Sequence, residues 1–299
     1  MGTIAITTKS FMTLPPLARL LRPDQWVKNL FVAAPLFFTP PAMSVANILL
    51  VLAGIACFCA FASSVYIVND YMDREADREH PVKADRPLAA GTVSLASAFS
   101  LFALLLGGGL AGALALDVRF AALGAAYISM NLAYSLWLKH VSVVDVLLIA
   151  VSFVLRVMAG AVLIDIEPSA WILIVSGLLA LFLALAKRRD DLVRSLGHGH
   201  RRSLSGYTLA FLDTSLAVVL GALLVAYMVY TTDQRVMEQL GTEHLVYTVI
   251  FVIAGVLRYL QITLVERRSG SPTAMVLSDR FLIVTILLWA LTLAILIHV

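Results

Sequence analysis

Residues 45–77 read VANILLVLAGIACFCAFASSVYIVNDYMDREAD, an apolar run that gives way to an acidic segment. As an α-helix, the uncharged part from about residue 45 to 69 is long enough to cross the roughly 30 Å hydrocarbon core of a bilayer. The helical pattern continues past the last apolar residue, so carboxylates are expected on the same helix where it leaves the membrane. This stretch predicts a membrane-spanning helix with an acidic end.

The rest of the chain has the same membrane character. Its 299 residues are 61% hydrophobic and 14% charged, and the mean hydropathy is +0.92, whereas soluble domains are about half apolar and a quarter charged. Composition therefore predicts an all-α integral membrane protein. No long polar stretch divides the chain, so we expect one domain over residues 1–299. The net charge of +3 includes no basic tract interleaved with aromatic residues, which argues against nucleic acid as a partner.

Eight apolar runs are long enough to span a bilayer. They cover residues 45–69, 95–116, 119–138, 143–164, 169–187, 209–231, 244–265 and 279–298. A ninth run, from Trp26 to about Phe38, is shorter and is followed by Pro40 and Pro41, so we expect it to cross obliquely or to insert only in part. The sequence predicts a bundle of about nine transmembrane helices.

The cations are distributed unevenly between the two ends of these helices. Of the 22 Lys and Arg residues, Arg119 and Arg235 fall on one side and Arg156 and Arg258 lie inside spans, which leaves 18 on the other side. The positive-inside rule places the crowded side in the cytoplasm. We expect a multi-pass protein of the inner (cytoplasmic) membrane, with its amino terminus and an active-site cavity on the cytoplasmic side.

Three aspartates end the helix that begins near residue 45. Asp70, Asp73 and Asp77 are spaced i, i+3 and i+7, so they share one face. Like charges at the negative end of a helix repel each other unless a cation binds them. Mg2+ prefers carboxylate oxygens combined with substrate phosphates, and Asn69 adds an amide beside the acids. The segment predicts a Mg2+ site in which the three aspartates are metal ligands and catalytic residues.

Two cations follow the acidic segment directly. We interpret Lys83 and Arg86 as contacts for the outer oxygens of a bound diphosphate. The alternative is a solvated loop in which these cations, with Arg74 and Arg78, merely neutralise the acids. Helical spacing at a membrane boundary favours the metal site.

A second charged cluster ends the run at 169–187. Lys187 and Arg188 are interpreted as contacts for a phosphorylated substrate, and Asp191 or Asp190 as a contact for a sugar hydroxyl or a metal. An ordinary positive-inside anchor is the alternative. The recurrence of charge four helices after the first cluster, at the same predicted membrane face, keeps both interpretations open.

One predicted span carries charges in its interior. Asp145, Ser152 and Arg156 are 7 and 4 residues apart, so they form one stripe that should face the bundle interior. A charge at mid-bilayer costs about 2.5 to 3.5 kcal/mol on insertion scales, which makes Arg156 a candidate substrate contact. The alternative is a buried clamp that holds helices together.

Further polar residues are candidates for contact with substrate. Tyr134, with Lys139 near the cytoplasmic end of the same span, is compatible with a polar wall and also with interhelical packing. Near the start of the chain, Arg22, Lys28 and Asn29 are candidates for binding a lipid phosphate. An interfacial belt of aromatic and basic residues is the competing interpretation there.

These motifs resemble those of a known family. The run NDYMDREAD at 69–77, with RPLAAG at 86–91, resembles the first motif of the UbiA superfamily of intramembrane prenyltransferases. Within it, the chain looks most like the decaprenyl-phosphate phosphoribosyltransferase branch. That likeness is carried by RPDQWVKN (22–29), HPVKADRP (80–87), VDVLLIAVSFVLRVMAG (144–160) and KRRDDL (187–192). The second motif departs from aromatic prenyltransferases, because a Lys- and Arg-rich segment replaces two aspartates separated by three residues.

The resemblance implies a specific reaction. It is the Mg2+-dependent transfer of 5-phosphoribose from 5-phosphoribosyl 1-diphosphate to a polyprenyl (decaprenyl) phosphate, with release of diphosphate. One alternative is a UbiA-type enzyme that moves a prenyl group from prenyl diphosphate to an aromatic acceptor; the basic second motif argues against it. Another is an ion-coupled transporter, whose site would be expected near the membrane midplane instead of at one face. The sequence is compatible with a homo-oligomer.

Overall fold

The structure, a computed structural model, describes residues 14–79, 83–195, 206–266, 275–276 and 278–298. These ranges contain helices and turns and no strand, so the all-α prediction is confirmed for the described part of the chain. The elements are α2 (Pro16–Leu20), η1 (Pro23–Ala33), α3 (Ala34–Phe37), η2 (Pro40–Ala42), α4 (Val45–Arg78), α5 (Leu95–Leu116), α6 (Val118–Leu136), η3 (Leu138–His140), α7 (Val144–Leu163), α8 (Ala170–Ser195), α9 (Leu209–Thr232), α10 (Gln234–Leu240), η5 (His244–Thr248), α11 (Val249–Leu260), η6 (Gln261–Val265) and α13 (Arg280–His298).

Seven helices among the described residues are long and apolar enough to cross a membrane. They are Val45–Arg78, Leu95–Leu116, Val144–Leu163, Ala170–Val193, Leu209–Thr232, His244–Val265 and Arg280–Ile297. The α6 helix has the length but a more polar composition, which includes Arg119 and Asn131. The predicted crossing at 26–38 forms the 3₁₀ segment η1 and the single turn α3, not a regular α-helix of spanning length. That α6 and residues 26–38 cross the membrane therefore remains a prediction.

Several long helices begin at side chains that cap them. The side chain of Ser44 accepts a hydrogen bond from the Asn47 amide at 3.2 Å at the start of α4, and Asp117 accepts from the amides of Arg119 and Phe120 at the start of α6. Such caps satisfy amide groups that have no partner within the first turn. Local sequence therefore sets where these helices begin.

The chain divides into two compact units. The first comprises residues 1–37, 42–139 and 152–168, and the second comprises residues 38–41, 140–151 and 169–299. The division falls within α7, whose residues 144–151 belong to the second unit and whose remainder belongs to the first. The expectation of a single domain over 1–299 stays a prediction.

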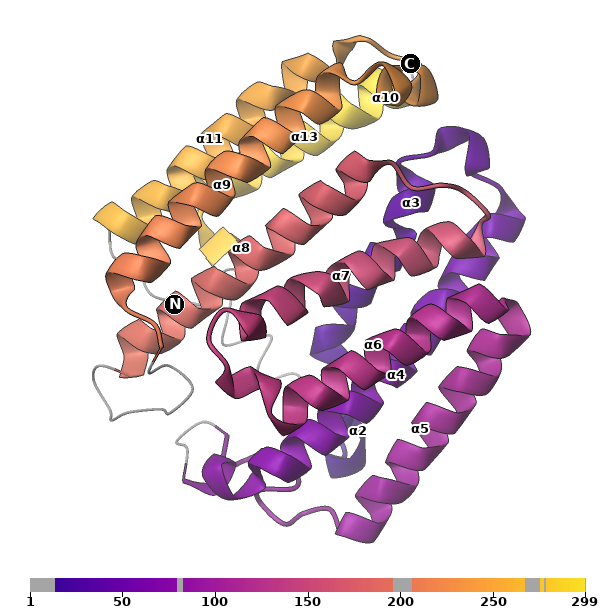
Figure 1. Cartoon of the computed structure of the whole chain (residues 1–299), viewed down its shortest axis with the longest axis vertical. Helices are drawn as coiled ribbons and strands as arrows, with labels where there is room; N and C mark the ends of the chain where they lie inside the picture. The colour runs from indigo at the N-terminus through magenta and orange to yellow at the C-terminus, as the bar shows by residue number, and fades with distance from the viewer. Residues whose placement is uncertain (1–13, 80–82, 196–205, 267–274, 277, 299) are drawn as a thin grey trace. The chain divides into compact units, whose positions relative to one another are not determined.

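In the first unit, α4, α5 and α6 pack against one another around an aromatic core (Figure 1). Phe58, Phe61 and Phe120 are fully buried there and meet edge to face. Gly109 of α5 and Gly124 of α6 both lie against the Phe61 ring, where an added Cβ would come within 2.8 and 2.6 Å of ring carbons. These glycines let both helices approach α4 closely.

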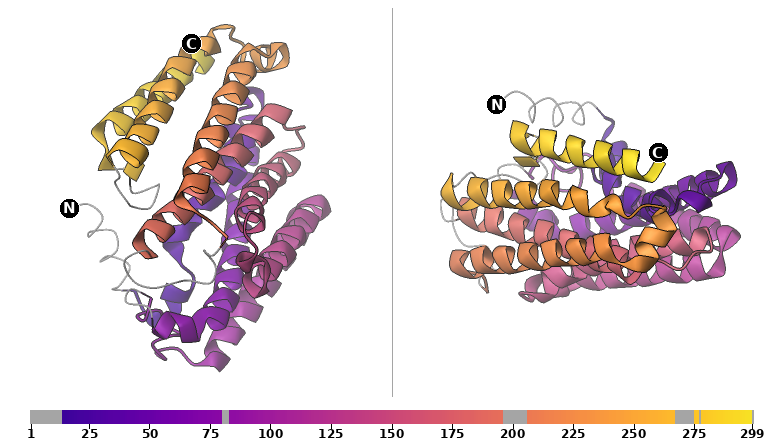
Figure 2. Two further views of the ribbon diagram at one scale, coloured as in Figure 1. Left: turned by 60° about the vertical axis from the view of Figure 1, so that its left-hand side comes forward. Right: turned by 90° about the horizontal axis from the view of Figure 1, so that it is seen from above.

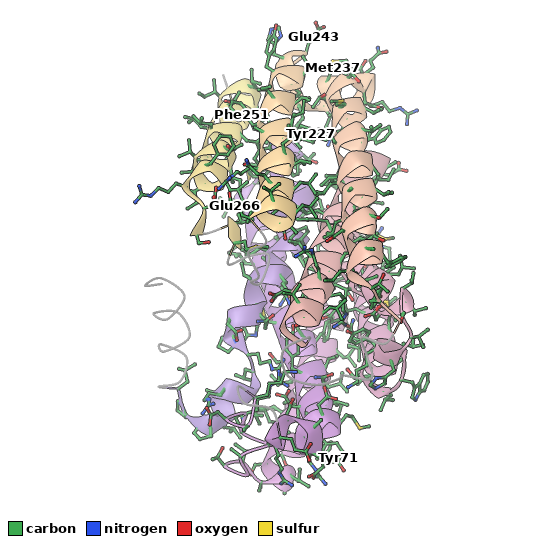
Figure 3. The ribbon with its side chains drawn as sticks, turned by 90° about the vertical axis from the view of Figure 1, so that its left-hand side faces the viewer. Tyr71, Tyr227, Met237, Glu243, Phe251 and Glu266 are labelled. Carbon is green, nitrogen blue, oxygen red and sulfur yellow. The ribbon has the colours of Figure 1, made fainter. Side chains whose placement is uncertain are left out.

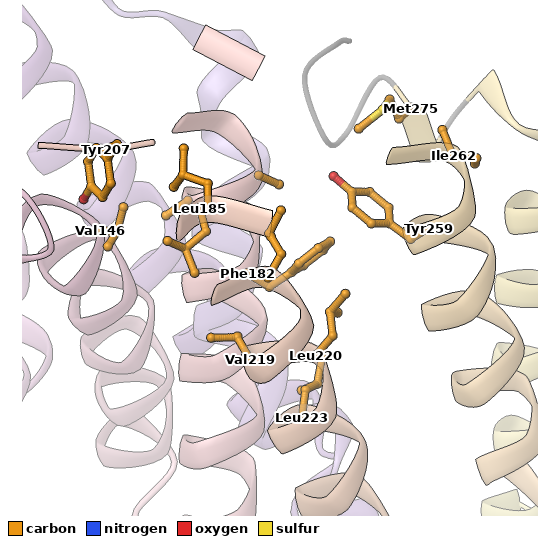
Figure 4. Close-up of a cluster of buried hydrophobic side chains, with 14 of the residues drawn as sticks. Val146, Phe182, Leu185, Tyr207, Val219, Leu220, Leu223, Tyr259, Ile262 and Met275 are labelled. Carbon is orange, nitrogen blue, oxygen red and sulfur yellow. The ribbon is translucent and has the colours of Figure 1, made fainter. Parts of the chain in front are cut away.

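In the second unit, α8 and α9 lie side by side (Figure 2), and α11 packs against both α9 and α13. The core contains Phe182, Leu220 and Tyr259 (Figure 4), with the rings of Phe182 and Tyr259 4.7 Å apart and nearly perpendicular. Figure 3 shows Glu243 and Glu266 at opposite ends of the continuous rod formed by η5, α11 and η6. This rod accounts for the predicted span at 244–265.

Candidate active site

The acidic segment lies on the last turns of α4, as its spacing predicted. The helix runs unbroken from the apolar residues through Arg78, so Asp70, Asp73 and Asp77 are carried by one rigid element. Asp70 and Asp77 are almost completely buried, whereas the Asp73 side chain is 31% exposed. The three carboxylates share a helix and differ sharply in their exposure to solvent.

Arginine side chains compensate the two buried carboxylates. Arg86 Nη1 lies 2.6 Å from Asp77 Oδ2 and 3.2 Å from Asp70 Oδ1, so one guanidinium bridges both acids. Arg22 also pairs with Asp70, from a backbone conformation in the left-handed region (φ 49°), and its guanidinium lies over the Tyr66 ring. Buried carboxylates need such partners, because removing an unpaired charge from water costs several kcal/mol.

The more exposed Asp73 has different partners. Lys139 Nζ, from η3, lies 2.5 Å from its Oδ1, and the Asn69 amide donates to its Oδ2 at 3.2 Å. Lys83 lies on the other side of the cluster, with Nζ 3.8 Å from Asp77 Oδ1. Asn69 and Lys83, which the sequence placed beside the acids, contact them in the structure. Lys139 and Arg22, which come from distant segments, contact the acids as well.

The donor atoms of this cluster are suited to Mg2+. In the part of the chain that the structure describes, no three His, Cys, Asp or Glu side chains converge into a ready-made metal site. Mg2+ in proteins is commonly held by one or two carboxylates plus substrate phosphates, and it does not require an all-protein cage. Asp70 and Asp77 already face one shared cation, Arg86. The residues present thus fit Mg2+ bound together with a phosphate ligand.

Arg156 lies at the centre of a buried polar network in the first unit. Its guanidinium donates to Asn29 Oδ1 at 2.8 Å, to the Ser152 carbonyl at 2.8 Å and to the Tyr127 hydroxyl at 2.9 Å. It also lies over the rings of Phe58, Tyr127 and Phe153. These bonds connect α7 to η1 through Asn29 and to α6 through Tyr127. The clamp alternative requires such connections between helices.

Three other predicted residues lie in the first unit. Asn29 is fully buried, and its amide donates to Cys59 Sγ at 3.2 Å, so it belongs to the Arg156 network. Lys28 is half-buried and donates to Gln25 Oε1 at 2.7 Å. Tyr134 is half-buried on α6. Both ends of the Asn29 amide are thus bonded to other side chains of the protein.

The second charged cluster lies at the end of α8, in the second unit. Arg188 Nε donates to Asp145 Oδ2 at 2.7 Å, and Arg188 Nη1 lies 3.5 Å from Asp191 Oδ2. Lys187 is exposed on the same turn. Asp190 is buried, while neighbouring Arg189 pairs with Asp213 of α9 at 2.5 Å. Asp191 thus lies within reach of Arg188, and its side chain is more exposed than that of buried Asp190.

The sequence did not predict one residue of this cluster. Tyr207, just before α9, donates its hydroxyl to Asp145 Oδ1 at 2.5 Å and accepts from the Val143 amide at 2.7 Å. Burial and the adjacent Asp145 carboxylate raise the pKa of Tyr207 to about 12, so the hydroxyl remains protonated and acts as a donor. A lone tyrosine between a glycine and a threonine carries no sequence signal for such a role.

Known proteins resemble this chain along nearly its whole length. The model of the UbiA prenyltransferase family matches residues 28–198. The decaprenyl-phosphate phosphoribosyltransferase of Mycolicibacterium smegmatis is 34% identical over 285 residues, which cover 91% of this chain and 89% of that protein. The protein of the same name from Corynebacterium glutamicum is 36% identical, with coverages of 91% and 83%.

A solved structure shares the fold. It is described as a UbiA homolog from Archaeoglobus fulgidus bound to GPP and Mg2+, and the match has a TM-score of 0.69 over 94% of this chain and 97% of that chain. At 21% sequence identity this likeness concerns the fold alone. The family is shown by the sequence comparisons, and the fold agrees with it.

Proposed function

Because this chain belongs to the UbiA prenyltransferase family, we propose that it transfers 5-phosphoribose from 5-phosphoribosyl 1-diphosphate to a polyprenyl phosphate such as decaprenyl phosphate. The observation that carries this proposal is its similarity, over 91% of its length, to two proteins named for decaprenyl-phosphate phosphoribosyl transfer. The basic end of α8 also supports this proposal. A phosphorylated sugar needs cations at this position, whereas a prenyl diphosphate would be served by a second metal ion bound to carboxylates.

The proposed reaction is a displacement at the anomeric carbon. An oxygen of the lipid phosphate forms a bond to C1 of the ribose while the bond from C1 to the diphosphate oxygen breaks, and the diphosphate leaves with the electron pair. The lipid phosphate is already an anion, so no strong general base is required. Positioning of the two substrates and stabilisation of the departing charge should supply most of the acceleration.

The acidic end of α4 is proposed to serve the diphosphate. Held through Asp73 and Asp77, with Asp70 close by, Mg2+ would neutralise the charge that develops on the leaving group. A UbiA homolog from Archaeoglobus fulgidus has been solved with Mg2+ bound. Arg86 and Lys83 would then turn from the carboxylates to the phosphate oxygens, as charge-assisted donors.

The remaining predicted residues are proposed to act at the sugar and the lipid. At the end of α8, Lys187 and Arg188 would contact the 5-phosphate, and Asp191 a ribose hydroxyl. Near the acids, Asn69 and Lys139 would orient the diphosphate. Lys28 and Tyr134 are proposed to contact the lipid phosphate, while Asn29 and Arg156 would support that contact by fixing the η1 segment.

The proposed topology has an active site on the cytoplasmic side of the inner membrane. It counts α6 and the 23–37 segment as two crossings in addition to the seven helices that, among the described residues, have both the length and the apolar character. The uneven distribution of lysine and arginine supports the orientation. Labelling of single cysteines introduced at Arg119 and Glu79 from either side of sealed vesicles would test it.

A three-arm assay on purified protein tests the function. The first arm offers 5-phosphoribosyl 1-diphosphate with decaprenyl phosphate, the second a prenyl diphosphate with an aromatic acid, and the third measures ion flux into proteoliposomes. We expect a phosphoribosylated lipid, identified by mass, and equimolar diphosphate in the first arm. Product confined to the second arm would assign the aromatic prenyltransferase activity, and flux without product would assign transport.

A further inference from the structure

The buried carboxylate of Asp145 is bonded on both of its oxygens. Its Oδ1 accepts from the Tyr207 hydroxyl at 2.5 Å and its Oδ2 accepts from Arg188 Nε at 2.7 Å. Asp145 itself is 1% exposed, and Tyr207 lies beside Val146 of α7 in the hydrophobic core of the second unit (Figure 4). Asp145 is thus a link between a core tyrosine and an arginine of the charged cluster, and a substrate does not reach it directly.

The backbone around this link is held in an unusual conformation. Val143 has φ 71°, a left-handed conformation that is unfavourable for a β-branched residue, and its amide donates to the Tyr207 hydroxyl at 2.7 Å. Gly206 packs directly on Ser142, where the Cβ of any other residue would overlap the serine side chain. Tyr207 and Gly206 therefore dock the start of the α9 segment onto the turn that precedes α7.

The geometry points to Tyr207 as a positioning residue for Arg188, acting through Asp145. A carboxylate that also accepts a fixed phenol hydrogen bond cannot rotate freely, so it holds the guanidinium by its Nε edge in one plane. The bidentate recognition of a phosphate requires a guanidinium of defined orientation. Tyr207 would raise affinity for the phosphorylated sugar without contacting it. The identity of the phosphorylated sugar rests on the proposed function. The hydrogen-bonded link from Tyr207 through Asp145 to Arg188 does not.

The test compares Tyr207→Phe with Tyr227→Phe. Tyr227 is also buried in the second unit, but in a different hydrophobic cluster from Tyr207. Its hydroxyl is bonded to Thr248 and Trp289, so its loss costs a buried hydrogen bond that does not involve Asp145. The first measurement is the NMR signal of the Arg188 Nε–H group in 15N-arginine-labelled protein, assigned by its disappearance in Arg188→Lys. The second is the KM for 5-phosphoribosyl 1-diphosphate and for decaprenyl phosphate.

We expect faster solvent exchange of the Arg188 signal and an about tenfold higher KM for the sugar donor in Tyr207→Phe, with kcat and the KM for the lipid unchanged. Tyr227→Phe should alter neither the signal nor either KM. An Arg188 signal in Tyr207→Phe like that of the wild type, or equal effects in both variants, would overturn the inference. If the signal changes as expected but the wild-type protein transfers no phosphoribose, the positioning role stands and the proposed substrate fails.

Discussion

The ammonium of Lys139 lies 2.5 Å from the carboxylate of Asp73, although the two residues are 66 positions apart in the sequence. Asp73 is also the most exposed of the three aspartates on α4, with 31% of its side chain accessible against 3% for Asp70 and 4% for Asp77. A ligand that arrives from solvent therefore meets Asp73 first. At the proposed metal site, the exchange of Lys139 for a metal ion at this carboxylate would require no opening of the core.

Replacement of Asp73 by asparagine should abolish turnover and leave stability nearly unchanged. The pair with Lys139 is partly exposed, and such pairs contribute at most about 1 kcal/mol, whereas loss of a metal-binding carboxylate removes charge stabilisation of the leaving diphosphate. Product formation and the melting temperature in detergent are the measurements.

Glu75→Gln is the matched control for this variant. Glu75 lies on the same helix and is more exposed, and it pairs with Arg74 and Arg78 instead of the site cations. It should retain full activity. Unreduced Mg2+-dependent turnover in Asp73→Asn would remove this carboxylate from the proposed metal site.

Removal of Mg2+ should stop the reaction without unfolding the protein. The buried carboxylates are already paired with Arg22 and Arg86, so the apo protein has compensating charge inside it. After chelation and dialysis, we expect activity to be lost, the melting temperature to fall by no more than about 2 °C and Mg2+ to restore turnover. Activity that survives exhaustive chelation would contradict metal dependence, and cooperative unfolding on chelation would indicate a structural ion.

Helical spacing predicts part of the geometry of the acidic face of α4. At about 100° per residue, positions i and i+7 fall within about 20° of each other and i+3 lies about 60° away. Asp70 and Asp77 accordingly share Arg86, while Asp73 turns toward Lys139. Spacing predicted that the acids lie together, but their cation partners depend on tertiary packing between distant segments.

Other features of the structure could be predicted from the sequence only in part. Apolar length located the start of each long helix within one residue. The α4 and α8 helices continue past residues 69 and 187 into the charged segments. Apolar length did not predict that residues 23–33 form a 3₁₀ segment, which is stabilised by the long-range bond between Asn29 and Arg156. Tyr207 was missed for the same reason, since its partners Asp145 and Val143 lie some 60 residues earlier in the chain.

Arg156→Met should destabilise the protein as well as reduce its activity. Loss of the guanidinium leaves the Asn29 side-chain oxygen and the Tyr127 hydroxyl without this donor inside the bundle. We expect a loss of about 3 kcal/mol of stability, measured as the melting temperature of the detergent-purified variant.

Arg119→Met provides the comparison for Arg156. Arg119 lies in the same unit, but its side chain is 58% exposed and its partners are at the surface, so its loss should change the melting temperature little. If Arg156→Met melts like the wild type and loses only activity, the guanidinium contacts substrate and the clamp interpretation is wrong.

Lys187 and Arg188 are adjacent on α8 but differ as probes of the sugar site. Arg188 is bonded to buried Asp145, so its removal leaves a carboxylate in the core with one partner fewer. Lys187 is exposed, so its substitution should leave the packing of the unit intact. An effect of Lys187 on substrate binding can therefore be separated from an effect on the fold.

Lys187→Met should raise the KM for 5-phosphoribosyl 1-diphosphate and leave the KM for the polyprenyl phosphate unchanged. Loss of one charge-assisted phosphate contact costs about 1.5 to 3 kcal/mol, or about 10- to 150-fold in KM. Initial rates with each substrate varied in turn give both constants. Arg235→Met, at an exposed cation of α10, is the control and should change neither. An unchanged constant for the sugar donor, or an effect confined to the lipid, would remove Lys187 from the sugar site and weaken the phosphoribosyl assignment of the whole α8 cluster.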